Sequence, residues 1–209
     1  MRLHSLTRRT VLACIGLGAS LALPVQAQTG NAGAVQSVLV AGIEFAPSTS
    51  VGNQAVVLNG AGTSNIMSTR ATAVGLYLSA KTQDADKALA LPGAKRLTVV
   101  ALRDLSARDL SNALLDRIRQ NAAPGEVEAN VMQIAAVGAV FGTRKKMGKG
   151  DVLTIDWLPG SKATEFRING ESTGEPIAGE RFYPLMMKVW LGPKVRGSTR
   201  DALLGAEGG

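Results

Sequence analysis

Runs of alternating apolar and polar residues predict several β-strands along the chain. Residues 151–158 read DVLTIDWL, and this period of two separates the two faces of an extended strand. Residues 69–78 (TRATAVGLYL) and 95–103 (KRLTVVALR) are apolar and β-branched over strand-like lengths. The pair Asn169-Gly170 follows the strand-like run ATEFRI and is typical of a two-residue hairpin turn. The C-terminal strands are therefore expected to form an antiparallel meander.

The spacing of apolar residues becomes helical in the middle of the chain. Leu110, Leu114 and Ile118 recur every four residues, which places them on one face of a helix. Ser106 precedes this run at the position of an N-cap, where its hydroxyl would accept a hydrogen bond from a free amide of the first turn. Similar spacing predicts further helices over about residues 84–91, 125–142 and 179–191.

The elements follow one another as strands, helices, strands and helices. This order is typical of an α+β fold, in which helices gather on one face of an antiparallel sheet. The composition does not change abruptly after residue 35, and the length of the chain fits one domain. We therefore expect a flexible N-terminal segment over residues 28–38 and one folded domain over residues 39–209.

The first 27 residues have the pattern of a secretory signal peptide. A basic start with Arg8 and Arg9 precedes an apolar run over about residues 10–23 and a small-residue site that ends at Ala27. This run is too short for a membrane-spanning helix, which needs about 20 apolar residues. The paired arginines fit a twin-arginine export signal, and a Sec signal fits almost as well. We expect cleavage near Ala27 and a periplasmic or secreted protein.

Removal of this leader would change the chemistry open to the protein. The only histidine, His4, and the only cysteine, Cys14, both lie within it. The mature chain would then lack the groups needed for Cys/His nucleophilic catalysis or a histidine general base. A zinc site is not expected for the same reason, and the sequence implies no metal and no cofactor.

The charge of the chain does not indicate a nucleic-acid partner. The formal net charge is +7, and the leader carries three arginines and no acidic residue, which leaves +4 for the remainder. The densest basic cluster, residues 144–149, contains no interleaved aromatic residues and is expected to be a solvated loop. The oligomeric state is left open by the sequence.

Six short motifs follow one another along the chain. They are LNGAG (58–62), TAVGLYL (72–78), LRDLSA (102–107), KGDVLTIDWLPG (149–160), FRING (166–170) and VWLG (189–192). Taken in this order, they resemble those of the chalcone isomerase-like family in its bacterial secreted branch, and the resemblance extends from about Leu39 to Leu204. It implies an open-faced β-sandwich, in which a large antiparallel sheet carries a layer of helices.

The enzymes of this family close a flavanone ring in the cleft between sheet and helices, and the resemblance locates their functional positions here. The arginine that holds the phenolate is replaced by Ser64, whereas the threonine that stabilises charge on the ketone is retained as Thr72. The tyrosine that acts with this threonine is replaced by Leu110. The positions of the asparagine and of a second hydroxyl group fall on Arg117 and near Tyr183.

These replacements argue against chalcone isomerase activity. Contacts placed in advance where charge develops are each worth about 2.7 to 4 kcal/mol of transition-state stabilisation. With Ser64 at the arginine position and Leu110 at the tyrosine position, we expect a protein that does not catalyse this reaction, and we leave open whether it is an enzyme of another kind.

Other members of the family bind fatty acids in the same cleft, where an arginine and a tyrosine hold the carboxylate. Arg70 could replace the missing cation, since residues two apart lie on the same face of a strand and Arg70 would then lie beside Thr72. In the alternative interpretation Arg70 lies at the strand end with its charged head in water. The candidate ligand-binding residues are Arg70, Thr72, Arg117 and Tyr183.

Three functions remain compatible with the sequence. The first is a non-catalytic periplasmic protein that binds a fatty acid or another small amphipathic acid or lipid in the sheet–helix cleft. The second is an isomerase- or lyase-type enzyme of unknown substrate that uses Arg70, Thr72 and Tyr183. The third is a structural or protein-interaction module whose cleft is filled by its own side chains.

Overall fold

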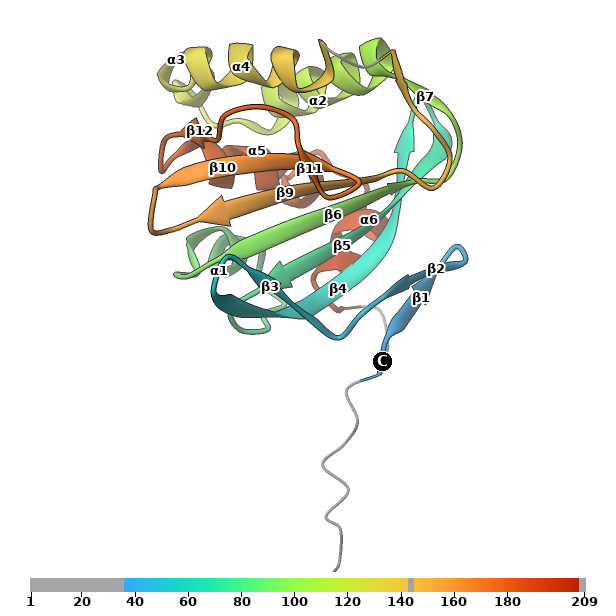
Figure 1. Cartoon of the computed structure of the whole chain (residues 1–209). Coiled ribbons are helices and arrows are strands. Elements are labelled where there is room, and N and C mark those ends of the chain that lie inside the picture. Colours follow the sequence, from blue (N-terminus) through green and yellow to red (C-terminus); the bar gives the residue numbers. More distant parts are fainter. Residues whose placement is uncertain (1–35, 143–144, 207–209) are drawn as a thin grey trace, which may run out of the picture. The chain divides into compact units, whose positions relative to one another are not determined.

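A curled antiparallel sheet of eight strands dominates the computed structural model, which describes residues 36–142 and 145–206 (Figure 1). The strands are ordered β11-β10-β9-β6-β5-β4-β3, and β12 pairs with β10 beside this path. Two short antiparallel pairs, β1–β2 and β7–β8, accompany the sheet. The strands are β1 (Val38–Val40), β2 (Ile43–Phe45), β3 (Ser48–Val51), β4 (Gln54–Ile66), β5 (Thr69–Leu78), β6 (Lys95–Ala101), β7 (Leu105–Ser106), β8 (Lys146–Met147), β9 (Val152–Leu158), β10 (Ala163–Ile168), β11 (Glu171–Ser172) and β12 (Ile177–Ala178).

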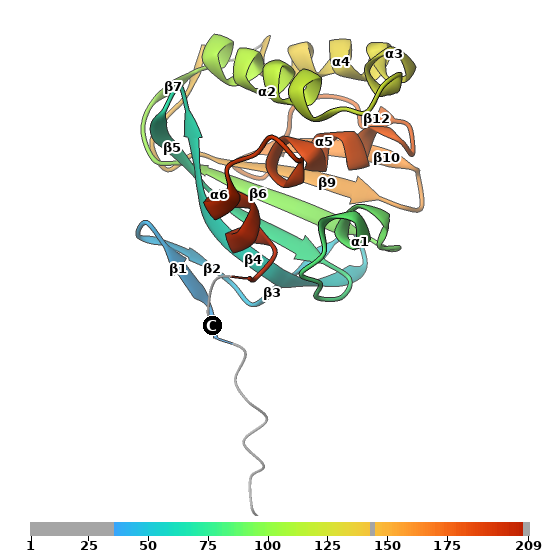
Figure 2. The same ribbon diagram turned by 180° about the vertical axis from the view of Figure 1, so that it is seen from behind.

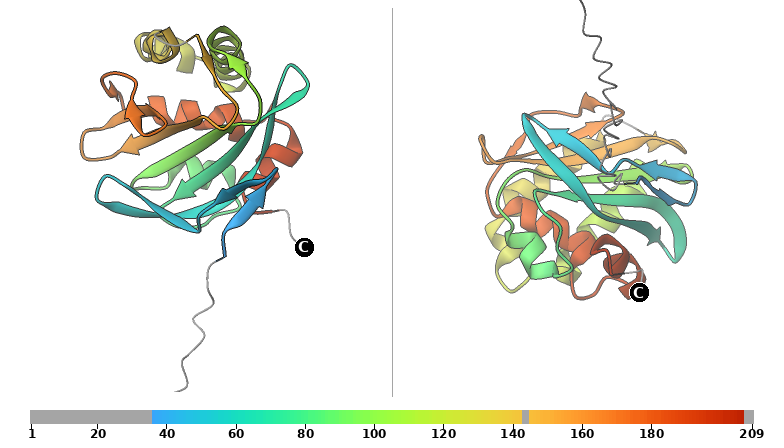
Figure 3. Two further views of the ribbon diagram at one scale, coloured as in Figure 1. Left: turned by 45° about the vertical axis from the view of Figure 1, so that its right-hand side comes forward. Right: turned by 90° about the horizontal axis from the view of Figure 1, so that it is seen from below.

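The helices all pack on one face of this sheet, as the α+β interpretation predicted. They are α1 (Ala85–Ala90), α2 (Ala107–Asn121), α3 (Glu126–Ala129), α4 (Val131–Gly142), α5 (Phe182–Leu191) and α6 (Gly197–Leu203). Figure 2 shows α1, α5 and α6 against the sheet, with α2, α3 and α4 in a layer farther out. The strands curl so that α5 lies between the sheet and this outer layer (Figure 3). None of the helices in the described ranges is long and apolar enough to cross a membrane.

The expected leader, residues 1–27, lies outside the described residues, as does most of the segment predicted to be flexible, residues 28–38. The description begins at Gln36, and Val38 is the first residue of β1.

The predicted C-terminal meander is confirmed by the pairing of its strands. β9 and β10 are antiparallel neighbours, with Ile155 opposite Phe166. The chain then turns through Asn169 and Gly170 into β11, so that Ile168 pairs with Glu171. Both turn residues have positive φ angles, 53° and 83°, which is the conformation that this pair favours in two-residue hairpins.

The two faces of the sheet bury separate apolar clusters. The helix-covered face contains most of the core, including Leu76, Leu97 and Ile155, which are fully buried. On the opposite face Phe45 of β2 lies over Gly75, where a Cβ atom would come within 2.5 Å of the phenyl ring. The short β1–β2 pair therefore contributes to the cover of the face that carries no helix.

The helix predicted over 125–142 is interrupted. Asn130 separates α3 from α4 with φ −122° and ψ 20°, and its side-chain amide donates a hydrogen bond to the carbonyl oxygen of Glu126 at 2.8 Å. Because this buried asparagine bonds to the preceding turn, the chain leaves helical geometry for one residue and starts again at Val131. The predicted N-cap of α2 is present, since Ser106 Oγ accepts a hydrogen bond from the amide of Asp109 at 3.0 Å.

The glycines of the motif LNGAG allow α6 to approach β4 closely. A Cβ atom on Gly60 would lie 2.2 Å from the carbonyl oxygen of Ala202, and one on Gly62 would lie 2.6 Å from the Ala202 side chain. Asn59, an extra residue in the register between β4 and β5, donates from its side chain to the carbonyl oxygen of Leu203 at 2.8 Å. These contacts fix α6 against β4, the strand that contains Ser64.

Candidate functional site

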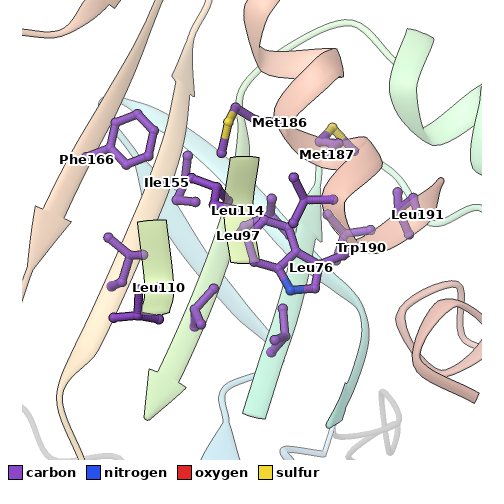
Figure 4. Packing of buried hydrophobic residues seen from close by; sticks show 14 of the residues in the cluster. Leu76, Leu97, Leu110, Leu114, Ile155, Phe166, Met186, Met187, Trp190 and Leu191 are labelled. Atoms are coloured by element: carbon purple, nitrogen blue, oxygen red, sulfur yellow. The ribbon is translucent and has the colours of Figure 1, made fainter. Parts of the chain in front are cut away.

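An apolar pocket lies between the helix-covered face of the sheet and helices α2, α4 and α5. Leu110 and Leu114 of α2 contribute to its wall, and Figure 4 shows them packed near Ile155, Phe166 and Trp190. The cavity measures about 40 Å³, whereas one water molecule needs at least about 10–15 Å³ on the same scale. The pocket thus holds a few waters at most, and its own side chains fill the rest.

One corner of this pocket is polar. Ser64 of β4 and Thr72 of β5 are cross-strand partners and both are buried. Arg117 reaches this corner from α2, and its Nη1 donates to Ser64 Oγ at 3.0 Å while its Nη2 donates to the carbonyl oxygen of Asn65. A guanidinium group, a serine hydroxyl and a threonine side chain therefore meet at the edge of an otherwise apolar cavity.

Arg117 is held by neutral acceptors alone in the described part of the chain. Burial lowers the pKa of its guanidinium, and no charged neighbour among residues 36–142 and 145–206 counteracts this effect. Arginine side chains nevertheless keep their proton in proteins, so the guanidinium of Arg117 stays cationic. The pocket corner therefore contains a partly desolvated positive charge that no carboxylate of the described residues neutralises.

The position of Arg117 follows from the pattern of α2. It lies three residues after Leu114 and seven after Leu110, so it continues the apolar stripe by which the helix faces the sheet. The next turn ends in Asn121, whose side-chain amide donates to the Arg117 carbonyl oxygen at 2.9 Å. The sequence thus directs a charged side chain to the buried side of the helix.

Residues 37–205 match the sequence pattern of the family described as chalcone isomerase-like. The chain belongs to the chalcone isomerase-like family. A search of curated proteins gives no match.

Among solved structures, the chain is similar to the crystal structure of an Arabidopsis thaliana fatty-acid binding protein, AtFAP1. The TM-score is 0.63 and the sequence identity is 14%, and the match covers 82% of this chain and 97% of that one. At this identity the similarity establishes a shared fold, which agrees with the open-faced β-sandwich implied by the motifs.

The arginine that the family resemblance places in β4 is absent, and an arginine from another element compensates for it. Ser64, at the position expected to contain the family's arginine, accepts a hydrogen bond from Arg117 of α2. A guanidinium group is thus supplied to this corner by the helix rather than by β4. Leu110, at the position expected to contain the tyrosine, adds an apolar side chain to the pocket wall.

Arg70 does not take the place predicted for it beside Thr72. Ser64 pairs with Thr72 and Asn65 with Arg70, so Ala71 is an extra residue that forms a bulge in β5. Such a bulge interrupts the two-residue alternation of side chains. Ala71 is accordingly buried in the helix-side core, and Arg70 is exposed and does not line the pocket.

Tyr183 lies in the core rather than in the pocket wall. Its side chain is fully buried in α5, and its hydroxyl donates to the carbonyl oxygen of Ile155 at 3.1 Å. Its ring lies 6.0 Å from that of Trp157, at an interplanar angle of 40°. Burial raises the pKa of this phenol well above its ordinary value. The hydroxyl therefore already donates a hydrogen bond to the sheet. Of the four predicted residues, the structure brings only Thr72 and Arg117 together at the pocket.

Proposed function

We propose that the protein is a non-catalytic, exported binding protein for a fatty acid or a similar amphipathic acid. The observation that carries this proposal is the position of Arg117. Its cation lies at the edge of an apolar pocket and, among the residues that the structure describes, is bound only by neutral acceptors. A carboxylate would suit this arrangement, because a guanidinium can donate two parallel hydrogen bonds to it. The similarity of fold to a fatty-acid binding protein supports the same ligand class.

In the proposed complex the carboxylate lies at the polar corner and the chain extends into the pocket. Arg117 would donate to the carboxylate in place of one of its present acceptors, and Thr72 lies on the same wall. Beyond this corner the wall is apolar, with Leu114, Phe141 and Val189 among its residues. A small number of polar groups at one end of an apolar pocket is typical of sites for amphipathic ligands.

The pocket must widen before a chain can enter. Ligand sites for small molecules usually measure about 300–1,000 Å³, and the cavity here measures about 40 Å³. The outer layer supplies Leu110 from α2 and Phe141 from α4 to the wall, so an outward shift of these helices would enlarge the space. The small volume also favours a second candidate function, an interaction module whose cleft is filled by its own side chains.

An enzyme that uses Arg70, Thr72 and Tyr183 together is not favoured. Arg70 is exposed beyond the bulge in β5, and Tyr183 is fully buried with its hydroxyl bound to the sheet. With Ser64 at the arginine position, we also propose that chalcones are not substrates.

Native mass spectrometry of the protein purified from its host tests the proposal. We expect a bound fatty acid on a chain that has lost residues 1–27, and titration calorimetry with dodecanoate should give saturable binding. Arg117→Gln should weaken this binding about 10- to 100-fold, since hydrogen bonds to charged groups are worth about 1.5–3 kcal/mol. Arg70→Gln removes the same charge from an exposed strand position and is the matched control.

Two results would contradict the proposal. A purified protein free of lipid that also fails to bind dodecanoate would favour the filled-cleft module. Equal loss of binding in both variants would assign the effect to net charge rather than to Arg117. An uncleaved N-terminus would refute export through a cleaved leader while leaving the ligand proposal intact.

A further inference from the structure

A second, polar hollow adjoins the apolar pocket at Arg117. It measures about 440 Å³ and opens between the start of the β4–β5 turn, the last turn of α2 and the loop from α5 to α6. Ser64 and Arg117 line both spaces, so the two are contiguous at the polar corner. The hollow is much larger than one carboxylate requires. The side chains that line it therefore indicate which head group a ligand would carry.

The charged side chains around this hollow are all basic. Arg117, Lys194 and Arg196 line it, and no aspartate or glutamate does so within the described residues. Lys194 and Arg196 are exposed, and the ion pairs found in the described ranges join other cations. Three positive charges without a carboxylate among them produce a local potential that favours a multivalent anion.

Hydrogen bonds fix the loop that supplies two of these cations. Asn121 of α2 joins both sides, because its amide donates to the Arg117 carbonyl oxygen and its Oδ1 accepts from the amide of Lys194 at 2.8 Å. Thr199 Oγ1 of α6 donates to the carbonyl oxygen of Thr63 in β4 at 2.9 Å. The backbone that supports Lys194 and Arg196 is therefore anchored to both α2 and β4.

Asn121 also explains why residue 192, just before this loop, is a glycine. A Cβ atom on Gly192 would lie 2.3 Å from Asn121 Oδ1, the atom that accepts the Lys194 amide. Only a residue without a side chain allows this approach, and the close contact holds the loop at the end of α2.

We propose that the ligand of this protein carries a phosphate monoester head on its acyl or alkyl chain, with the phosphate in the hollow between Arg117, Lys194 and Arg196. This inference rests on the proposed function, since it assigns the head of the ligand whose chain would enter the apolar pocket. A phosphate monoester carries a charge of about −1.5 to −2 and three acceptor oxygens near pH 7, which suits three cations better than a carboxylate does.

Matched amphiphiles of equal chain length test the inference by titration calorimetry. We expect wild-type protein to bind monododecyl phosphate about 10- to 100-fold more tightly than dodecanoate, because the phosphate gains charge-assisted contacts with Lys194 and Arg196. The variant Lys194→Gln/Arg196→Gln should lose this preference and keep its affinity for dodecanoate. The control Lys81→Gln/Lys87→Gln removes the same charge from exposed positions near α1 and should keep the preference.

The outcomes separate this inference from the proposed function. Binding of dodecanoate without a preference for the phosphate head, or a preference that persists in Lys194→Gln/Arg196→Gln, overturns the inference alone. Absence of binding by either amphiphile overturns the proposed function with it. Inorganic phosphate that binds as tightly as monododecyl phosphate would show an anion site that does not act on a lipid, and would also overturn the inference.

Discussion

Arg96 and Arg117 are two partly buried arginines on opposite faces of the sheet, and their surroundings differ in one respect. Arg96 forms a bidentate ion pair with Asp156, with Nε to Oδ1 at 2.7 Å and Nη2 to Oδ2 at 2.6 Å. Within the described ranges, Arg117 donates only to Ser64 Oγ and a backbone carbonyl oxygen. The hydrogen bond to Asp156 raises the pKa of Arg96, whereas burial lowers that of Arg117.

This difference separates a cation that serves the fold from one that can serve a ligand. The charge of Arg96 is neutralised by a side chain on the neighbouring strand, and Nη1 also donates to Thr49 Oγ1 at 3.2 Å. A ligand could not displace the two contacts with Asp156 without leaving this carboxylate buried and unpaired, which is costly. Arg117 can exchange a neutral acceptor for a carboxylate or phosphate oxygen and gain a charged partner. Burial of an arginine is thus a poor guide to function unless its acceptors are known.

The largest effect is expected from breaking the structural pair. Asp156→Asn leaves Arg96 charged and without its carboxylate in a site where Asp156 is 2% exposed, so the free energy of unfolding should fall by about 3–5 kcal/mol. Urea denaturation followed by tryptophan fluorescence measures this loss. Glu165→Gln is the control, because its partner Arg167 is 41% exposed and such pairs contribute about 1 kcal/mol or less. Equal losses in the two variants would contradict the structural role given to the Arg96–Asp156 pair.

Lys95 is a third cation and is more fully buried than the two arginines, and it extends the comparison to pH dependence. Its Nζ donates to the carbonyl oxygen of Leu89 at 3.0 Å, and burial lowers its pKa from 10.5 to about 8. Above pH 8 the folded state loses this proton before the unfolded state does, so the unfolded state binds more protons and stability rises with pH. Below pH 8 both states are protonated and the cost of burying the charge is present in full.

We expect the free energy of unfolding to increase by about 2 kcal/mol between pH 7 and about 9.5, a range below the ordinary pKa of tyrosine. The variant Lys95→Met should be more stable than wild type at pH 7 and should lack most of this increase. Urea denaturation at the two pH values measures both quantities. Parallel pH profiles of the two proteins would show that Lys95 stays protonated in the fold.

The sequence predicts what depends on neighbouring residues and misses what depends on pairing across the sheet. The Asn169-Gly170 turn, the Ser106 cap and the apolar stripe of α2 are local patterns, and all three are present. The placement of Arg70 is wrong because it assumes unbroken alternation through β5. The bulge at Ala71 depends on how β5 pairs with β4, which no pattern within β5 alone specifies.

The polar corner shows the same limit. Ser64 and Arg117 are 53 residues apart in sequence and meet only when α2 packs against the end of β4. The sequence identifies Arg117 as a candidate through the position it matches in the family, but not the serine as its acceptor. One local signal was available, since a charged residue that continues an apolar stripe has to find polar acceptors where the helix is buried.

The smallest effect on stability, and the sharpest contrast with Arg96, is expected from Arg117→Met. The change removes a desolvated charge and two hydrogen bonds and keeps much of the apolar stem, so the free energy of unfolding should change by less than about 1 kcal/mol. Urea denaturation provides the measurement, with Asp156→Asn in parallel. A loss of 3 kcal/mol or more would place Arg117 among the residues that hold the fold together. Because a group retained for a ligand contributes little to the empty protein, near-neutral stability together with lost dodecanoate binding is the combination that distinguishes Arg117 from Arg96.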